Sequence, residues 1–521
     1  MIAGSMQAFP LTLDKILDHA ARWYPEGEIV TARPDGSVTR TDYAALRDRS
    51  LRVSSLLTEL GIGVGDRVAT LAWNSQAHVE AWYGIMGMGA VCHTLNPRLT
   101  VAQLGAMASE SGAKMLIAST DLMPVALEIA ARSPAITRVL AIDGDDADAH
   151  ALNPLIAAAA PDAIWGQFDE TAPCGLCFTS GTTGAPKGVT YTHRSSFLHT
   201  LRILQVDVMA ISGRDTVLAM VPMFHANAWG LPFALPAVGG RLVLPGRQAD
   251  GASLARLIAG EGVTIGVGVP TVWLGLVEHL EATGGELPSL KRIIVGGAPM
   301  APALMARIEA RLGVTVQTSW GMTELSPSGT VAPPDDPQRT ASVSGRPALG
   351  VDLLLTDADG TALPEQRGQE GHLRVRGASV VDRYFGHEQS ATDGDGWFPT
   401  GDLARIDTRG NLTITGRSKD LIKSGGEWIN PAEIEAVVGA LPQVSLAAVI
   451  GRSDPKWGER PILLVEMKNG DAVEDEVLLE PVRLRLAPWW VPDAVIRLTE
   501  MPLAATGKID KLRLRAEYGS G

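Results

Sequence analysis

The chain has 521 residues, more than one hydrophobic core usually accommodates, so we expect two or more domains. It is 45% hydrophobic and 20% charged, as a globular protein is, and its net charge of −13 argues against a nucleic-acid partner. No apolar run approaches the ~18 residues of a transmembrane segment, the start lacks the features of a signal peptide, and three cysteines favour a reducing, cytoplasmic location.

Helical and strand-like segments alternate over the first three hundred or so residues. Helical spacing is expected over residues 11–23, 77–89, 100–111 and 151–160. Short apolar strands are expected at 90–94, 114–117, 217–220, 241–244, 263–269 and 292–295, and a glycine turn enters a further strand over 61–72. This alternation predicts an α/β fold for a large N-terminal domain.

The pattern changes after about Gly371 to short alternating strands, which predict a small sheet or barrel closing the large domain. A polar, Gly-rich segment over 416–435 follows, and its composition is typical of a linker. We therefore predict a domain boundary near Lys419. Residues 1–418 would form the large domain and residues 419–521 a small, mobile α+β domain.

Residues 179–188 read TSGTTGAPKG, a loop whose short side chains leave backbone N–H groups free to bind an anion. Ser180, Thr182 and Thr183 add donors, and Lys187 adds a positive charge for phosphate oxygens. A Walker A loop would need Gly where Pro186 stands and Ser or Thr at the position of Gly188. The segment therefore predicts a polyphosphate loop of another kind. An ordinary Gly/Thr turn is the alternative that the accompanying motifs disfavour.

Cys174-x-x-Cys177 could indicate a redox or zinc site, but a structural zinc needs four ligands and the chain has no second cysteine pair. The motif runs directly into the phosphate loop as an apolar strand. We therefore predict buried, unreactive thiols.

Further motifs accompany this loop. They are VPMFHANAWG (221–230), GGAPM (296–300), QTSWGMTEL (317–325), Thr400-Gly401-Asp402 with Arg417, and LAATGKIDK with Lys508. Together they resemble the adenylate-forming enzymes, which include acyl-CoA synthetases, luciferases and nonribosomal adenylation domains. The resemblance extends from about Leu11 to about Tyr518. Taken alone, the GGAPM turn could be structural, Asp402 a cap and Lys508 a surface charge.

The resemblance implies which residues contact ATP and AMP. Trp320 takes the place of the usual tyrosine and would still stack on adenine, while Asp402 would accept the ribose hydroxyls with Arg417 beside it. The implied nucleotide-binding residues are Ser180, Gly181, Thr182, Thr183, Gly184, Lys187, His225, Gly297, Ala298, Pro299, Ser319, Trp320, Gly321, Thr323, Asp402, Arg417, Lys419 and Lys423.

The same resemblance implies a catalytic set of Lys508, Glu324 and Thr179, in which Thr179 and Glu324 hold Mg²⁺ through oxygen ligands. Lys508 would bridge the substrate carboxylate and the α-phosphate in the first half-reaction only. The small domain would then rotate about Lys419 and present the Gly425-Gly426 turn to the thiol of coenzyme A. Cations and oriented N–H groups would offset the repulsion among the anionic reactants.

The acid is less clear from the sequence. Trp229 resembles the tryptophan that gates the acyl tunnel of long-chain enzymes, and Gly297 and Trp428 are expected to line the acyl site. PWWVPD (488–493) resembles short- to medium-chain ligases, including those for methylthiopropionate, although Pro488 replaces the usual lysine. We expect a medium-length aliphatic acid, with a thioether acid next.

Several alternatives remain open at this stage. They are an aryl-propenoic acid such as ferulate or coumarate as substrate, a carrier-protein acceptor, luciferase-like oxidation, and an ATP-binding regulator without ligase activity. No carrier domain follows Lys508 in the sequence, which favours free coenzyme A as acceptor. Homodimerisation is suggested only by analogy with the long-chain enzymes.

Overall fold

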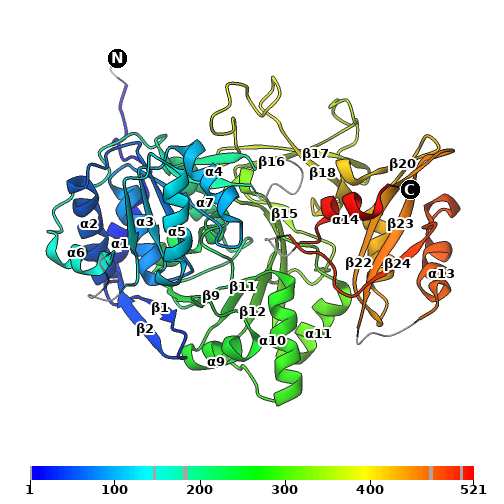
Figure 1. The fold of residues 1–521 in the computed structure, drawn as a ribbon, viewed down its shortest axis with the longest axis horizontal. Coiled ribbons are helices and arrows are strands. Elements are labelled where there is room, and N and C mark those ends of the chain that lie inside the picture. The colour runs from blue at the N-terminus through cyan, green and yellow to red at the C-terminus, as the bar shows by residue number, and fades with distance from the viewer. Residues whose placement is uncertain are drawn as a thin grey trace.

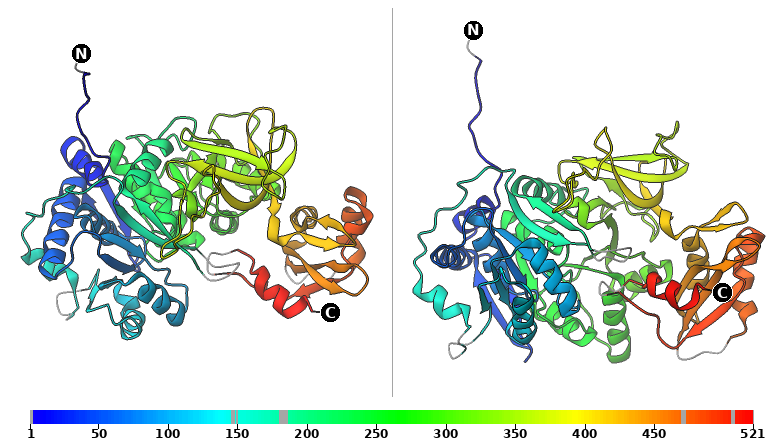
Figure 2. Two further views of the ribbon diagram at one scale, coloured as in Figure 1. Left: turned by 90° about the horizontal axis from the view of Figure 1, so that it is seen from above. Right: turned by 45° about the horizontal axis from the view of Figure 1, so that its top comes forward.

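A computed structural model describes residues 3–144, 148, 150–179, 186–468, 473–504 and 508–520. A large N-terminal domain contains three sheets, and a small C-terminal domain contains a fourth (Figure 1). The small domain, orange to red, lies at one end of the molecule beside the large domain (Figure 2). This confirms the predicted α/β class and the large and small domains. No helix in the described part of the chain is long and apolar enough to cross a membrane.

The first sheet is six-stranded and largely parallel, with β7 and β8 antiparallel at one edge. Its strands, in spatial order, are β6 (Arg138–Ala141), β5 (Met115–Ala118), β3 (Arg67–Leu71), β4 (Val91–Thr94), β7 (Pro173–Phe178) and β8 (Gly188–Thr192). The helices α4 (Val101–Ser111) and α5 (Met123–Arg132) pack on one face. The other face is covered by α2 (Tyr43–Glu59), α3 (Gln76–Gly87) and α6 (Leu152–Ala158).

The second sheet has nine strands and is parallel through its centre. Their order is β15 (Arg346–Pro347), β14 (Ser328–Val331), β13 (Thr315–Gly321), β12 (Arg292–Val295), β11 (Ile265–Gly268), β9 (Thr216–Ala219), β10 (Arg241–Leu244), β1 (Glu28–Ala32) and β2 (Val38–Asp42). One face carries α9 (Gly251–Glu261), α10 (Pro270–Thr283) and α11 (Pro302–Leu312). The other face packs against α1 (Asp14–Trp23), α7 (His193–Ile203) and α8 (Leu231–Val238).

Local sequence explains where several of these helices begin and end. Thr100 and Gln103 form a capping box at the start of α4, and Gly112 ends the helix with a φ of 61°. Proline occupies the first turn of α10 and α11, where its missing N–H costs no hydrogen bond. The expected alternation of helices and strands is therefore confirmed over the large domain.

The predicted strands after Gly371 belong to a four-stranded antiparallel sheet. It consists of β16 (Val351–Thr356), β17 (Glu370–Gly377), β18 (Phe398–Ile406) and β19 (Leu412–Arg417). The five-stranded sheet of the small domain follows the order β21 (Glu427–Ile429), β20 (Ile422–Ser424), β23 (Gly458–Met467) and β22 (Val444–Asp454), with β24 (Val495–Leu498) parallel to β23. Its helices are α12 (Pro431–Gly439), α13 (Asp475–Arg485) and α14 (Lys511–Tyr518).

The linker prediction is wrong for most of the segment 416–435. Residues 422–429 form the β20–β21 hairpin, and α12 begins at Pro431. The hairpin is ordered because Ile422 and Ile429 face each other across it and are both buried in the small domain. Only a short 3-10 turn, Ser418–Asp420, lies between β19 and this hairpin.

Candidate active site

The motifs converge where strands of the two large sheets end. Thr179 follows β7, the 221–230 segment follows β9, the GGAPM turn follows β12, and Thr323 follows β13. Ligands of open α/β sheets generally bind outside the carboxyl ends of the strands. The topology therefore brings these distant parts of the sequence to one side of the large domain.

The neck of the phosphate loop is closed by two contacts between Thr179 and Lys187. Thr179 N donates to Lys187 O at 2.9 Å, and Lys187 N donates to Thr179 Oγ1 at 3.0 Å. Five residues assigned to phosphate binding, Ser180, Gly181, Thr182, Thr183 and Gly184, lie outside the described residues. These contacts join the end of β7 to the start of β8, the two edge strands that the loop connects.

Tyr384 connects Lys187 to Glu324, and sequence reasoning missed it. Lys187 Nζ lies 4.6 Å from the centre of the Tyr384 ring, whose hydroxyl donates to Glu324 Oε1 at 2.9 Å. Burial raises the pKa of the Glu324 carboxyl, which is only 8% exposed. Nothing in the local sequence RYFG distinguishes Tyr384, because its role depends on a contact across 60 residues.

Glu324 and Thr179 supply the type of oxygen atoms that Mg²⁺ prefers, a carboxylate and a hydroxyl. The backbone oxygen of Thr323, the residue before Glu324, accepts the Tyr191 hydroxyl at 2.8 Å and fixes this segment. The chemistry of the two oxygen donors of Glu324 and Thr179 suits a magnesium ion shared with substrate phosphates, and the metal site stays a prediction.

Asp402 is the best-connected carboxylate of the site and is 2% exposed. Trp320 Nε1 donates to its Oδ2 at 2.9 Å, and Arg417 Nε lies 2.7 Å from its Oδ1. Asp402 and Arg417 also pair directly across β18 and β19. Burial raises the pKa of Asp402, while Arg417 and the Trp320 N–H act in the opposite direction. The tryptophan that replaces the usual tyrosine therefore contacts the carboxylate expected to hold the ribose.

Lys508 stands on the small domain but lies among groups of the large one. The residue is exposed on its loop, yet burial of the ammonium and the nearby Arg417 lower its pKa, whereas Asp402 acts to raise it. Lys508 in turn helps to lower the pKa of His225. Lys508 thus lies close enough to Asp402 and Arg417 for their charges to affect the pKa of its ammonium. Lys419 lies near the same carboxylate.

The 221–230 segment contains an unusual left-handed turn. Four consecutive non-glycine residues, 226–229, have φ between 45° and 54°, and Gly230 follows at 78°. Left-handed backbone costs roughly 1–2 kcal/mol per non-glycine residue, so the surrounding structure must stabilise this turn. Just before it, His225 has its pKa lowered to about 4, mainly by burial, and is therefore neutral at pH 7.

Trp229, at the end of this turn, packs on the GGAPM segment. A Cβ atom on Gly296 would lie 2.9 Å from Trp229 Cη2, and one on Gly297 would lie 3.9 Å from Cζ2. Glycine at 296 is therefore required for this close approach. Ser319 Oγ donates to the Val295 oxygen at 2.9 Å and fixes the same turn from β13. Gly297 and Pro299 are exposed and Ala298 is half-buried, so this turn borders the site.

Gly321 makes another close approach. A Cβ at this position would lie 2.2 Å from the Pro327 oxygen, because the chain folds back on itself between β13 and β14. Thr323 and Glu324 lie within this tight return, between β13 and β14.

Four predicted residues lie apart from this group, on the β20–β21 hairpin of the small domain. Lys423, Gly425, Gly426 and Trp428 are all exposed, and Lys423 Nζ lies 5.4 Å from the centre of the Trp428 ring. Gly425 N donates to Trp457 O at 2.8 Å, in a turn with φ values of 60° and 93° at Gly425 and Gly426. The described contacts of this hairpin are within the small domain, so its part in adenylate, acyl or thiol binding stays a prediction.

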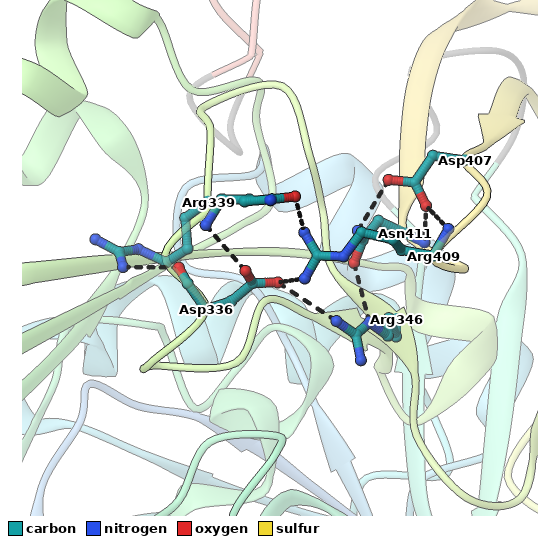
Figure 3. Close-up of polar contacts among 7 residues, drawn as sticks. Asp336, Arg339, Arg346, Asp407, Arg409 and Asn411 are labelled. Atoms are coloured by element: carbon teal, nitrogen blue, oxygen red, sulfur yellow. Dashed lines mark hydrogen bonds and ion pairs between the residues drawn. The ribbon is translucent and has the colours of Figure 1, made fainter.

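A polar cluster away from the site joins the nine-stranded sheet to the four-stranded one (Figure 3). Asp336 Oδ2 accepts from Arg409 at 2.8 Å and from Arg346 at 3.4 Å, and Arg346 Nε donates to Asn411 Oδ1 at 3.2 Å. Asp407 accepts from Asn411 Nδ2 at 2.9 Å. The cluster anchors the β18–β19 turn, and thereby the hairpin that carries Asp402, to the segment after β14.

All three cysteines are free and buried, which confirms the prediction of buried thiols for Cys174 and Cys177. Burial raises the pKa of all three thiols, that of Cys174 to about 12. Cys174 and Cys177 are part of the strand β7 that leads into the phosphate loop. Among the described residues no group of three or more His, Cys, Asp or Glu side chains is arranged to hold a metal ion.

An α/β domain with helices on both faces of its sheets, and a small domain whose Lys508 lies near Asp402 and Arg417, agree with the resemblance to adenylate-forming enzymes. Comparison with known families gives the same answer. The model of the AMP-binding enzyme family matches residues 17–385, and that of the AMP-binding enzyme C-terminal domain matches residues 433–508. The chain belongs to the AMP-binding enzyme family, and it is an enzyme of the acyl-CoA synthetase type.

Relatives and solved structures agree over nearly the full length. The chain is 40% identical to a 3-methylmercaptopropionyl-CoA ligase of Ruegeria lacuscaerulensis, covering 99% of this chain and 98% of that one. It is 40% identical to a medium-chain-fatty-acid–CoA ligase of Ectopseudomonas oleovorans, covering 99% and 97%. Its fold matches the crystal structure of ATP-bound MatB from Rhodopseudomonas palustris with a TM-score of 0.87 and 27% identity, over 98% and 99% of the chains.

Proposed function

We propose that this enzyme joins a medium-length aliphatic acid or a thioether acid to coenzyme A, using ATP and passing through an acyl-adenylate. The observation that carries the proposal is the arrangement around Asp402, which accepts from Trp320 Nε1 at 2.9 Å and pairs with Arg417 at 2.7 Å, with Lys508 close enough for both charges to affect the pKa of its ammonium. At this position a lysine of the small domain would contact the anionic substrates of an adenylation step. The two 40% identical relatives support the choice of acid.

In this proposal the chain's cations oppose the repulsion between a carboxylate and a triphosphate. Lys187 would neutralise the outer phosphates, and Lys508 would hold the carboxylate beside the α-phosphate while the new P–O bond forms and pyrophosphate leaves. Mg²⁺, held by Thr179 and Glu324, would supply further positive charge to the phosphate oxygens. Trp320 would cover the adenine, and Asp402 would accept the ribose hydroxyls.

The second half-reaction would need the small domain to turn about Lys419, the boundary between residues 1–418 and 419–521. The short connection Ser418–Asp420 supports this position for the pivot. Rotation would withdraw Lys508 and bring the Gly425-Gly426 turn to the adenylate, where the thiolate of coenzyme A would attack the carbonyl carbon and release AMP. Lys423 and Trp428, on the same hairpin, would contact the adenylate in that state.

The apolar end of the acid would lie between Trp229 and the turn of Gly296 and Gly297. An indole can close an apolar slot and open it by rotating, which suits an acid of moderate length better than a fixed wall. A homodimer and a cytoplasmic location remain predictions from the sequence.

The test is AMP release from ATP, Mg²⁺ and coenzyme A across straight-chain C2 to C16 acids, 3-methylthiopropionate, cinnamate and ferulate. We expect the highest kcat/KM with a C4 to C10 acid or with 3-methylthiopropionate, and a thioester as product. Preference for ferulate or cinnamate would replace the aliphatic proposal with the aryl-propenoic one. AMP release without a need for coenzyme A would contradict the proposed acceptor.

A further inference from the structure

Asp420 immediately follows the proposed pivot and contacts the C-terminal helix. Its Oδ1 accepts from Arg515 at 3.0 Å, and its Oδ2 lies 3.9 Å from Lys511 Nζ. Both cations are on α14, which lies on the side of the small domain that faces the large domain (Figures 1 and 2). The carboxylate side chain is only 16% exposed, so solvent screens these pairs less than it would at an open surface.

The helix α14 begins three residues after Lys508 and is continuous with its loop. Ala504 N donates to Lys508 O at 2.7 Å, and Asp510 N donates to Pro502 O at 2.8 Å. Asp510 also caps α14 by accepting from Arg513 N at 3.1 Å. These contacts leave little freedom between Lys508 and the helix, so the position of α14 determines the position of the lysine.

A second carboxylate, Glu435, also pairs with α14. Lys511 Nζ lies 2.7 Å from Glu435 Oε1 on α12, and the same oxygen accepts from Val449 N on β22 at 2.6 Å. Glu435 therefore fixes the helix to the sheet of the small domain. Asp420, in contrast, links α14 to the segment Ser418–Asp420, about which the small domain would rotate.

Asp420 also lies among several cations. Arg417 and Arg515 both act on Lys419 to lower its pKa, and Asp420 acts against them. Lys508 adds a further positive charge near Arg417 and Lys419. Without the Asp420 carboxylate these groups would repel one another across the connection between the domains.

We propose that Asp420 is a positioning residue for Lys508. Through Arg515 and Lys511 it joins the pivot and the lysine loop into one unit, so that the closed position of the small domain also sets the position of the ammonium. This inference rests on the proposed function, in particular on the part of Lys508 in adenylation. Loss of the Asp420 charge should therefore slow the first half-reaction and leave the second unchanged.

The test compares the two half-reactions in Asp420→Asn, which keeps the size of the side chain and removes its charge. We expect acid-dependent ATP–pyrophosphate exchange to fall at least about tenfold in kcat, since small misplacements of a catalytic group have effects of this size. Thioester formation from supplied acyl-adenylate should stay within about twofold of the wild type. Asp420→Glu should restore part of the exchange activity.

Arg515→Gln provides an independent variant from the other side of the contact. It should lower exchange in the same way, and the double variant should lose little more than Asp420→Asn alone because both changes remove the 3.0 Å pair between Asp420 and Arg515. Glu517→Gln is the matched control, since it breaks an exposed pair with Arg513 of 2.7 Å on the same helix and should leave both half-reactions unchanged. Melting temperatures would identify any variant that fails to fold.

Failure of this inference can be told from failure of the proposed function. If the wild type exchanges pyrophosphate and Lys508→Ala does not, but Asp420→Asn and Arg515→Gln both do at the wild-type rate, Asp420 does not position the lysine. Equal losses in both half-reactions would show a general structural role and also overturn the inference. If the wild type itself shows no acid-dependent exchange, the proposed function is wrong.

Discussion

Replacement of Trp320 by phenylalanine tests the contact between the aromatic residue proposed to cover adenine and Asp402, the carboxylate proposed to hold the ribose. The phenyl ring keeps an aromatic face but lacks the indole N–H, which donates to Asp402 Oδ2 at 2.9 Å. Asp402 is buried, so the carboxylate oxygen that loses this donor cannot readily turn to water. The variant therefore separates stacking from hydrogen bonding.

The size of the effect follows from the groups involved. A hydrogen bond to a charged group contributes about 1.5–3 kcal/mol. Arg417 remains 2.7 Å from the other oxygen of Asp402, so the carboxylate keeps its charged partner and the loss should lie near the lower limit. About 1.5–2 kcal/mol corresponds to a roughly 10- to 30-fold decrease in kcat/KM for ATP.

The assay is acid-dependent ATP–pyrophosphate exchange with MgATP varied, accompanied by calorimetric titration of ATP. Trp320→Leu, which loses the aromatic face as well, should be more severely affected than Trp320→Phe. A phenylalanine variant that folds normally and keeps its kcat/KM for ATP within twofold of the wild type would refute the reasoning. Asp402 would then be oriented by Arg417 alone.

Three further predictions concern the lysine, the acyl slot and pH. Lys508→Ala should abolish pyrophosphate exchange yet leave thioester formation from supplied acyl-adenylate largely intact, and equal loss of both would contradict the two-conformation proposal. Trp229→Ala should extend the accepted acids to longer chains in the C2 to C16 panel, whereas an unchanged profile would mean that Trp229 only packs. Burial raises the pKa of Asp402 and Glu324, so as the pH falls both carboxylates should take up protons at a pH above the ordinary carboxyl value of about 4. The KM for ATP should therefore begin to rise while the pH is still above about 4. A KM that stays constant down to pH 4.5 would contradict this.

Much of the fold could be predicted from periodicity, because the central strands are short apolar runs that are buried on both faces and separated by amphipathic helices. Residues 292–295, for example, form β12 as expected. The hairpin at 422–429 was not predicted, since Ile422 and Ile429 are its only buried apolar residues and the others are polar or glycine, apart from the exposed Trp428. Two isolated isoleucines are too weak a pattern to indicate a strand.

The residues of the candidate site likewise include some that the sequence predicts and some that it does not. Motifs that lie within a few residues of one another, such as Thr323 and Glu324, could be recognised from the sequence alone. Tyr384 could not, because its hydroxyl reaches Glu324 from a loop with no distinguishing composition. The bond from Trp320 to Asp402 was also hidden, since the sequence predicts a stacking surface and gives no sign that the indole N–H would find a carboxylate 82 residues away.

The burial of all three cysteines has a practical consequence for an enzyme whose co-substrate is itself a thiol. Thiolates are the reactive form, and burial with a raised pKa suppresses both access and ionisation at Cys92, Cys174 and Cys177. Mixed disulfides with coenzyme A should therefore not form on the native protein. A single cysteine introduced at an exposed position such as Leu512 of α14 would be the reactive thiol, so that a fluorophore could report the motion of the small domain in an otherwise unaltered chain.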